Sequence, residues 1–541
     1  MLRAAAVFCV FGAITSAIFV WSTHGAGELL MARNSMAWFA VASVAAILLG
    51  RTGALALVNQ LVAPAWQKPA RTRWVLAGAV CAILIFCARV VLDGFLNSGD
   101  EYAYFLQAQT FARGKLWVDA PSPASAFELM RFMEKDGRWL SIYQPGWPLI
   151  LTLPVALGIP VWLVCPIFGA LTVLVFFRLA ERLMRVESAF LATLGLCTSA
   201  FFIFNFASLF SHAPGALAAV LFAFCGLRFL EQGAPRWALL AGVSLGALGF
   251  IRAINAVLLV LPFLVAVLAT PRRRLGLFWF CLGGVPFAVL LLAYNKLITG
   301  NPLLLVQAWL LHGSEPIGPP TASSMGESLK RLVRLFLWTS PTIFVGWPLA
   351  FGVVAWRRRL SFVDWLAPAT LIGFALYGGE GGIQHGPRYY LEGWSFALIT
   401  VGKAIEPIFS AGAKRAEWLA AAILAHLTFQ LGYLVPRASR EHTVVMERQG
   451  LYRKVARAGL DNALVLDDVG TTRPLPPRDL VRNGLTVGDE PVTYALDKDD
   501  QTTQILRQRF PKRRFYRFYG GELHDVLDRN GQFIPKPPGF W

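Results

Sequence analysis

Long apolar stretches, separated by short basic connections, make up most of the chain. A helix rises about 1.5 Å per residue, so roughly 20 apolar residues are needed to cross a bilayer. By that criterion we predict about thirteen membrane-spanning helices. They lie near residues 4–22, 36–60, 74–92, 160–181, 188–206, 213–231, 237–251, 255–270, 276–296, 331–355, 361–378, 391–409 and 416–435. The apolar stretch 145–158 is short and proline-rich, and is either a re-entrant or interfacial helix or the start of the fourth span.

Lys and Arg residues in the short connections indicate which side of the membrane each one faces. When the spans are counted in order, the basic clusters fall on one side. The clusters are Arg51, Lys68, Arg71 and Arg73; Arg178, Arg182 and Arg185; Arg228 and Arg236; Arg272 to Arg274; Arg357 to Arg359; and Lys414 and Arg415. We therefore predict that these connections are cytoplasmic, and that the loop 93–145 and the tail 436–541 lie on the outer side.

The predicted fold class is mainly α, a polytopic transmembrane helical bundle with a large outer loop after the third span and a small C-terminal α/β domain. The predicted parts are N-terminal helices 1–92, an amphipathic extracytoplasmic loop 93–145, a helical core 146–435 and a soluble tail 436–541. In the loop, apolar residues such as Phe127, Leu129 and Phe132 are typical of segments that lie in the membrane interface.

The tail alternates strand and helix patterns. Strands are predicted at 463–467, 491–495 and 514–519, and a helix at 501–510. The pattern leaves two roles open for the tail, which are acceptor binding and structural capping.

Composition agrees with a membrane protein. The 541 residues are 56% hydrophobic and only 15% charged, whereas soluble domains have about 25% charged residues. The net charge of +18 is concentrated in the connecting clusters, so we predict no nucleic-acid binding. All seven cysteines lie in apolar runs without metal-ligand spacing and are interpreted as small buried hydrophobic residues. The first apolar run is predicted to be an uncleaved helix and not a signal peptide.

Two adjacent acids, Asp100 and Glu101, follow the third predicted span directly. Carboxylates at the edge of a membrane are costly to desolvate. They are either hydrated loop residues or include a general base placed at the membrane surface. Other polar residues predicted on the same outer face are Tyr104, Tyr143, Gln144, His212, Arg252, His385 and Arg388.

An acidic pair at the outer end of an early span, followed by Tyr and an amphipathic loop, resembles the GT-C superfamily of integral-membrane glycosyltransferases. The resemblance is to its family-39-like group, which includes protein O-mannosyltransferases and the bacterial aminoarabinose transferase that modifies lipid A. Further similar segments are 143–149 (YQPGWPL), 249–252 (GFIR), 294–302 (YNKLITGNP) and 386–389 (GPRY). Here the acidic loop follows the third span, not the first, and two additional N-terminal helices account for the difference.

The resemblance implies an inverting transferase that moves a sugar from a polyprenyl-phosphate donor to a lipid, glycan or protein acceptor at the outer face. It implies that Asp100 is the general base and Glu101 its neighbour. For cations that stabilise the donor phosphate we expect Arg388 first and then Arg252. Arg252 alternatively extends from a helix end to the interface, and Arg388 alternatively anchors its loop to Glu380 or Glu392.

Weaker expectations concern residues that line the sugar or phosphate site. These are Tyr104, Tyr143, Gln144, His212 and His385, and each of the histidines is more often structural than functional. No cofactor is expected beyond the lipid-linked donor. A divalent metal is not required by this group, and Glu101 is its candidate ligand if one is used.

The expected location is the bacterial inner membrane, multi-pass, with the loop and tail in the periplasm. Two other functions stay open: a transporter or lipid flippase, with Asp100 and Glu101 as coupling sites, and a non-catalytic envelope assembly protein. A transporter tends to place ionisable residues near the midplane, whereas the polar residues here are predicted at one face. The sugar, the acceptor, the lipid length and the oligomeric state are not predicted.

Overall fold

A computed structural model of the chain describes residues 67–312, 331, 335, 338–339, 341–376, 382, 384–409, 413–468, 481–528 and 534. The predicted spans near 4–22 and 36–60 lie outside the described residues. The chain divides into two compact units. The helical unit takes its described residues from Met1–Val91, Trp162–Leu290 and Gly318–Arg440. The loop–tail unit takes them from Leu92–Val161, Leu291–Ile317 and Glu441–Trp541.

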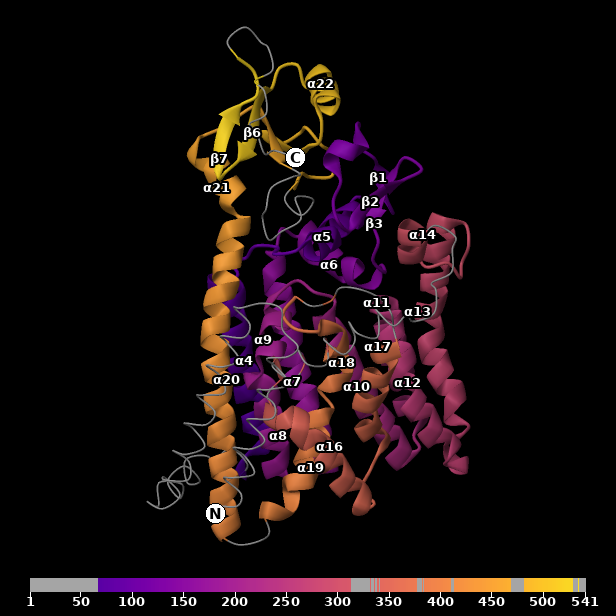
Figure 1. Cartoon of the computed structure of the whole chain (residues 1–541). Coiled ribbons are helices and arrows are strands. Elements are labelled where there is room, and N and C mark those ends of the chain that lie inside the picture. Colours follow the sequence, from indigo (N-terminus) through magenta and orange to yellow (C-terminus); the bar gives the residue numbers. More distant parts are fainter. Residues whose placement is uncertain are drawn as a thin grey trace. The chain divides into compact units, whose positions relative to one another are not determined.

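The helical unit consists of apolar helices, several of them short or broken (Figure 1). In chain order they are α4 (Pro69–Phe86) with a π-helical turn η1 (Cys87–Val91), α7 (Val164–Leu183), α8 (Val186–Thr198), α9 (Ala200–Ala207), α10 (His212–Gln232), α11 (Pro235–Ile251), α12 (Ala253–Leu268), α13 (Gly276–Thr299), α16 (Pro341–Trp356), α17 (Leu366–Leu376), α18 (Leu391–Trp394), α19 (Ala397–Phe409) and α20 (Ala413–Arg448). Single 3-10 turns are η4 (Pro271–Arg273), η5 (Phe362–Trp365) and η6 (Arg388–Tyr390). The ends of α13 and α20 continue into the loop–tail unit.

Among the described residues, four helical stretches are long and apolar enough to cross a membrane: Pro69–Val91, Val161–Leu183, His212–Gln232 and Gly276–Thr299. A fifth candidate is the pair α8 and α9, which is bent by 57°. Each stretch lies where an apolar window predicted a span. The window near 188–206 is not one straight helix, because Ser199 has an extended backbone between the two helices.

The α10 helix lies in the interior of the helical unit. Of its apolar window, 72% is buried in protein, compared with 17% for the window of α13. It packs against α7 and α11, and its Phe222 ring is 5.4 Å from the ring of Phe263 and 6.3 Å from that of Phe362. The first residue of α10 is His212, so one predicted site residue starts on a buried helix.

The loop–tail unit combines short helices with two small sheets. Its loop elements are α5 (Gly99–Ala112), β1 (Val118–Asp119), η2 (Ala124–Phe127), β2 (Phe132–Lys135), β3 (Arg138–Ser141), α6 (Gly146–Ala156) and α14 (Val306–His312). The turn η3 (Val161–Leu163) begins at Val161, where the chain passes into the helical unit. Its tail elements are α21 (Gly450–Arg457), β4 (Ala463–Asp468), β5 (Val492–Asp497), α22 (Asp500–Arg509), β6 (Arg514–Tyr519) and β7 (Glu522–Asp525). The first sheet is antiparallel with the order β1-β3-β2, and the second has the order β5-β4-β6-β7.

In the second sheet, β4 runs parallel to both β5 and β6, and β7 closes the edge as the antiparallel partner of β6. The strands β4, β5 and β6 and the helix α22 coincide with the strands and helix expected from the sequence. The strand β7 was not predicted. It is short, and Gly520 and Gly521 with positive φ form the turn before it, a conformation that glycine adopts without steric cost.

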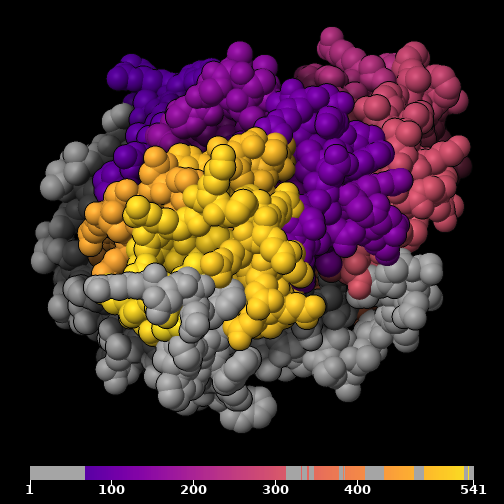
Figure 2. All heavy atoms as spheres, turned by 90° about the horizontal axis from the view of Figure 1, so that it is seen from above, coloured from indigo at the N-terminus to yellow at the C-terminus, as the bar shows by residue number. Residues whose placement is uncertain are grey.

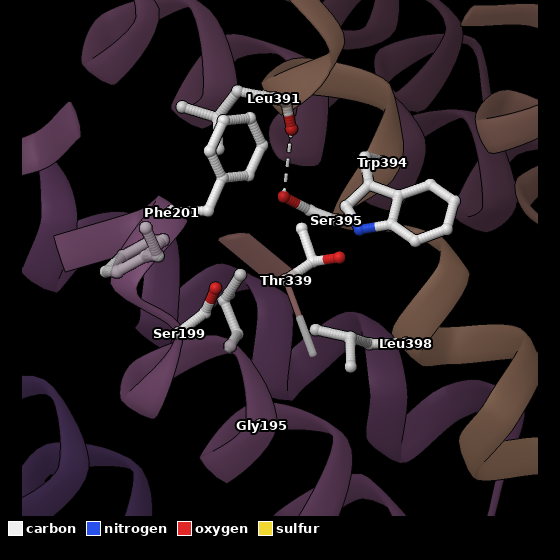
Figure 3. Close-up of a pocket in the computed structure, with 10 residues that line it drawn as sticks. Gly195, Ser199, Phe201, Thr339, Leu391, Trp394, Ser395 and Leu398 are labelled. Atoms are coloured by element: carbon white, nitrogen blue, oxygen red, sulfur yellow. Dashed lines mark hydrogen bonds between the residues drawn. The ribbon is translucent and has the colours of Figure 1, made fainter. Parts of the chain in front are cut away.

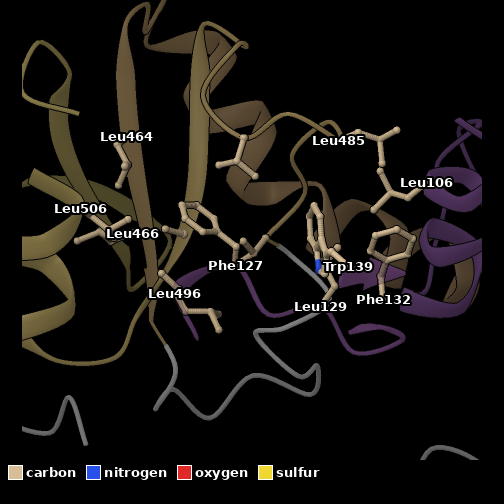
Figure 4. Packing of buried hydrophobic residues seen from close by; sticks show 14 of the residues in the cluster. Leu106, Phe127, Leu129, Phe132, Trp139, Leu464, Leu466, Leu485, Leu496 and Leu506 are labelled. Carbon is tan, nitrogen blue, oxygen red and sulfur yellow. The ribbon is translucent and has the colours of Figure 1, made fainter. Parts of the chain in front are cut away.

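The loop and the tail share one hydrophobic core (Figure 4). From the loop come Phe127, Phe132 and Trp139, and from the tail come Leu464 and Leu496. On the surface, the tail (yellow) lies beside loop residues (purple) in Figure 2. Burying each such side chain contributes about 1.5–3 kcal/mol, so neither segment would keep this core without the other.

Our expectation that the apolar loop residues lie in the membrane interface is wrong for three of them. Phe127, Leu129 and Phe132 are 1%, 7% and 0% exposed and belong to the shared core. Their apolar surface is removed from water by the tail, so lipid contact is not needed to bury it.

Two helix boundaries differ from the expected ones. The helix α6 is a separate element that ends before η3 and α7 begin, so residues 145–158 are not the start of the fourth span. The helix α20 continues from Ala413 to Arg448 with Pro436 inside it, although the tail was expected to begin there. A proline removes a single backbone hydrogen bond, and neighbouring groups often compensate for it in membrane helices.

Candidate functional site

The two predicted acids lie in the first turn of α5. Ser98 is the N-cap of this helix, and its hydroxyl oxygen accepts a hydrogen bond from the backbone N–H of Glu101 at 3.2 Å. A serine at this position satisfies a backbone N–H that has no partner within the helix. The helix N-terminus also carries partial positive charge, which favours acids in the first turn. The local sequence Ser-Gly-Asp-Glu therefore both starts the helix and places Asp100 at its end.

Asp100 is held by groups from two later segments of the loop. Its Oδ1 atom accepts a short hydrogen bond from the Tyr143 hydroxyl, and Arg131 Nε lies 3.4 Å from the same oxygen. Removal from water, together with the negative charge of Asp100, raises the pKa of Tyr143 well above its usual value. The phenol therefore stays protonated and donates. These contacts fix the orientation of a carboxylate that is 13% exposed.

Glu101 has a different environment. It is 1% exposed, and its Oε2 atom accepts a hydrogen bond from the Ser98 hydroxyl at 3.0 Å. Glu101 and Ser98 thus bond to each other across the first turn, which stabilises the start of α5. Among the described residues, no group of three or more His, Cys, Asp or Glu side chains is arranged to hold a metal ion.

Two further predicted residues lie near Asp100. The ring of Tyr104 is 4.4 Å from that of Tyr143, and Tyr104 is 3% exposed. Gln144 is partly buried in the segment just before α6. The structure therefore brings Asp100, Tyr104 and Tyr143 together through one hydrogen bond and one ring contact.

The tail contacts the same helix from another side. The Tyr102 hydroxyl donates a hydrogen bond to the backbone oxygen of Asn483 at 2.7 Å. The Arg482 guanidinium lies 5.0 Å from the centre of the Tyr102 ring and 4.4 Å from that of Phe95. Cation–π contacts of this kind stabilise both partners. The position of α5 thus depends on the tail as well as on the loop.

In the helical unit, Ser211, His212, Arg252, Asn255 and Glu392 form a buried polar cluster. At its centre is the side chain of Glu392, which is 0% exposed. Its Oε1 atom is 3.0 Å from His212 Nδ1 and 2.9 Å from Arg252 Nε. Its Oε2 atom accepts a hydrogen bond from Asn255 Nδ2 at 2.9 Å. A buried carboxylate needs such partners because desolvating an unpaired charge costs several kcal/mol.

Helix ends bring the cluster together. His212 is the first residue of α10, and Arg252 separates α11 from α12 with a non-helical backbone (φ −150°, ψ 82°). Asn255 lies in the first turn of α12, and Glu392 in the short helix α18. Gly215 allows the close approach: a Cβ atom there would lie 2.9 Å from Glu392 Oε1 and 3.2 Å from the Arg252 Cδ.

Arg388 and His385 lie in the same unit, around the ring of Phe210. The Arg388 guanidinium is 4.3 Å from the centre of this ring, the His385 ring is 5.8 Å from it and the His212 ring 6.4 Å. Arg388 is 8% exposed and His385 is fully buried. The backbone N–H of Arg388 donates to the oxygens of Gly382 and Gly386. Phe210 therefore connects both residues to the buried polar cluster.

The alternatives considered for the two arginines can now be compared with the structure. Arg252 does not extend from its helix end into the interface, because its guanidinium pairs with Glu392. Glu392, one of the two acids considered as an anchor for Arg388, thus pairs with Arg252. The other, Glu380, lies outside the described residues.

A small cavity in the helical unit lies beside α18 (Figure 3). Its lining is largely apolar, with Ser199, Thr339 and Ser395 as the hydroxyl-bearing residues. The Ser395 hydroxyl already donates to the backbone oxygen of Leu391 at 3.0 Å. None of the site residues predicted from the sequence lines this cavity, so we assign no function to it.

Three residues of these arrangements were missed as site residues. Glu392 was considered only as an anchor for Arg388, although a carboxylate within an apolar run is itself a signal of function. Asn255 follows Arg252 by three residues, and Arg252 is the N-cap of the helix α12 that contains Asn255 in its first turn. For Arg131 there was no local signal, since its partner lies in a different segment of the loop.

Comparisons with known proteins agree with this fold. A family model described as dolichyl-phosphate-mannose-protein mannosyltransferase matches residues 145–295. The crystal structure of ArnT from Cupriavidus metallidurans bound to undecaprenyl phosphate has a similar fold, with a TM-score of 0.51 and 17% identity over 80% of this chain and 88% of that one. The apo state of that protein matches with a TM-score of 0.50 and 16% identity over 82% of this chain and 89% of that one.

A weaker match is the oligosaccharyltransferase of Archaeoglobus fulgidus tethered with an acceptor peptide, with a TM-score of 0.43 and 11% identity over 66% of this chain and 55% of that one. None of the curated proteins compared with the chain matches it. The family model matches part of the chain, and the ArnT structures have a similar, mainly helical fold; both agree with the resemblance that the sequence motifs indicated.

Proposed function

We propose that this protein is an inverting glycosyltransferase that moves a sugar from a polyprenyl-phosphate donor to a lipid, glycan or protein acceptor at the outer face of a membrane. The observation that carries the proposal is the arrangement around Asp100. A general base needs a carboxylate in a fixed orientation with access to its substrate. Asp100 is partly exposed at a helix end, and Tyr143 and Arg131 contact one of its oxygens.

In the proposed reaction, Asp100 removes the proton from an acceptor hydroxyl as its oxygen attacks the anomeric carbon. The bond between that carbon and the phosphate oxygen breaks, and the polyprenyl phosphate leaves with the electron pair. Attack from the face opposite the leaving group inverts the anomeric centre. Glu101 supports the acid as part of the helix start, and Tyr104, Tyr143 and Gln144 are proposed to line the sugar site.

The leaving phosphate gains negative charge, which fixed cations stabilise. We assign this role to Arg252 and Arg388, with His212 and His385 as hydrogen-bonding partners. All four lie within the helical unit. Arg388, His212 and His385 surround the Phe210 ring, and Arg252 shares the Glu392 carboxylate with His212. The similarly folded ArnT was crystallised with undecaprenyl phosphate, which supports a polyprenyl phosphate as the lipid carrier here.

We further propose that the protein has about thirteen spans in a bacterial inner membrane, with the loop and the tail in the periplasm. The charge pattern of the connections supports this orientation. The tail forms an α/β layer over the loop, and its shared core with the loop supports the structural alternative considered for it.

The experiment that tests the function is transfer from a panel of polyprenyl-phosphate sugars by purified protein, comparing wild type with Asp100→Asn. The variant keeps the shape of the side chain and removes the base, so transfer should fall on the order of 10²-fold or more. Asp93→Asn is a matched control, because Asp93 is a partly exposed acid in the same loop and pairs with Arg453 at 3.1 Å.

Three outcomes separate the claims. Transfer by the wild type and the Asp93 variant, but not by the Asp100 variant, supports both the enzyme class and the base. Transfer that survives Asp100→Asn would overturn the assignment of the base and leave the class in place. No transfer by the wild type from any donor of the panel would count against the class.

A further inference from the structure

Glu392 lies at the centre of the buried polar cluster. Some nitrogen atoms of the neighbouring His212 and Arg252 bond within the cluster, and others do not. On His212, the Nδ1 atom faces Glu392 at 3.0 Å. On Arg252, the Nε atom faces Glu392, and Nη1 donates to the Ser211 hydroxyl at 3.0 Å. Within the part of the chain that the structure describes, no hydrogen-bond partner is seen for His212 Nε2 or Arg252 Nη2. The Arg252 guanidinium lies 5.7 Å from the centre of the Tyr389 ring.

A carboxylate facing Nδ1 favours the histidine tautomer with its proton on that atom. The opposite nitrogen, Nε2, is then the group available to a ligand. The guanidinium is a rigid planar fork, so fixing Nε and Nη1 also fixes the direction of Nη2. Glu392 thus determines which nitrogen of each neighbour is available and where it lies.

The cluster has features of a built site. Asn255 accepts a hydrogen bond from Arg252 Nε through its Oδ1 atom at 3.2 Å and donates to Glu392 through Nδ2 at 2.9 Å. It therefore holds the acid and the arginine in one arrangement. Gly215 provides the space for the carboxylate, since any larger residue would contact it. A positive side chain and an imidazole that are both fixed in this way suit an anion with several oxygens, such as a phosphate monoester or diester.

We infer that Glu392 is a positioning residue that directs His212 Nε2 and Arg252 Nη2 toward the phosphate of a lipid-linked donor. This inference rests on the proposed function, and assigns to it a residue that touches no substrate. A purely structural role predicts something different. Loss of Glu392 would then lower the stability of the helical unit without a specific effect on phosphate binding.

The chain offers a matched control for this distinction. Asp364 in η5 is also fully buried in the helical unit and pairs with Lys403 at 2.6 Å. Asp364 lies just before the start of α17, a helix of eleven residues that is about 16 Å long. Tyr389, three residues before Glu392, stacks on Phe374 near the end of the same helix. Asp364→Asn thus removes a buried charge of the same kind away from the cluster.

The test measures the Kd of undecaprenyl phosphate, the donor KM and kcat, and the thermal unfolding midpoint in the same detergent. For Glu392→Gln we expect a Kd and a donor KM raised about tenfold, because the carboxylate that orients both donors becomes a neutral amide. For Asp364→Asn we expect a lower unfolding midpoint with the Kd and KM of the wild type.

A double-mutant cycle tests whether Glu392 acts through Arg252. In the Arg252→Ala background, Glu392→Gln should raise the Kd by less than threefold, since the group it positions is already absent. Equal fold-changes in both backgrounds would overturn the inference, as would an unchanged Kd in Glu392→Gln or a Kd raised equally in Asp364→Asn. The proposed function fails separately, if the wild type transfers no sugar.

Discussion

The contact between Tyr143 and Asp100 leads to the sharpest prediction about the proposed base. Tyr143→Phe removes only the hydroxyl that donates to Asp100 Oδ1 and keeps the ring that packs against Tyr104. A hydrogen bond to a charged group is worth about 1.5–3 kcal/mol, which corresponds to about 10- to 150-fold in rate. Arg131 stays 3.4 Å from the same oxygen and retains part of the orientation. We therefore expect kcat to fall about tenfold, at the lower end of that range.

The assay is transfer from a saturating polyprenyl-phosphate donor, with donor KM measured in parallel. Donor KM should change less than kcat, because Tyr143→Phe keeps the ring at the proposed sugar site and leaves the phosphate cations in place. Tyr294→Phe is the control: its hydroxyl is buried, and no hydrogen-bond partner for it is seen among the described residues. Removing that hydroxyl should leave kcat unchanged. A Tyr143→Phe enzyme with the kcat of the wild type would refute the claim that this hydrogen bond positions Asp100.

Three further predictions concern the cluster, the shared core and pH. Gly215→Ala should raise the donor KM, because its Cβ would lie 2.9 Å from a carboxylate oxygen of the buried polar cluster. Gly78→Ala should leave the donor KM unchanged, because nothing lies within 4 Å of a Cβ at that position. Equal donor KM values for the two variants would contradict this. Phe127→Ala should cost about 3–5 kcal/mol and expose loop and tail together to limited proteolysis, and cleavage confined to the loop would show that the core is not shared. Burial raises the pKa of Tyr102 and Tyr143 above the usual tyrosine value, so the unfolded state loses these protons first and stability should fall as the pH rises above about 10. The thermal unfolding midpoint, measured from about pH 8 to about pH 11, checks this. A midpoint that does not fall over this range would contradict it.

Much of the helical architecture could be predicted from hydrophobic pattern alone. The runs that became α4, α7, α10 and α13 are long enough to span a membrane whatever surrounds them, since lipid requires a helix to satisfy its own backbone. The tail strands β4 to β6 also followed from local alternation. The break at Ser199 and the continuation of α20 past Pro436 did not, because a serine in an apolar run does not mark a break and a proline ordinarily ends a helix.

The candidate site divides in the same way. Asp100 and Arg252 could be selected because each lies at the end of an apolar run, where a charged residue is costly to desolvate and is often functional. Their partners could not: Tyr143 and Arg131 are distant from Asp100 in sequence, and Glu392 is distant from both Arg252 and His212. The sequence therefore determined which segments are long and apolar enough to cross a membrane and which charges are costly to bury. Only the tertiary structure decided which groups neutralise those charges, and that the loop buries its apolar residues against the tail, because these contacts join segments that no local pattern connects.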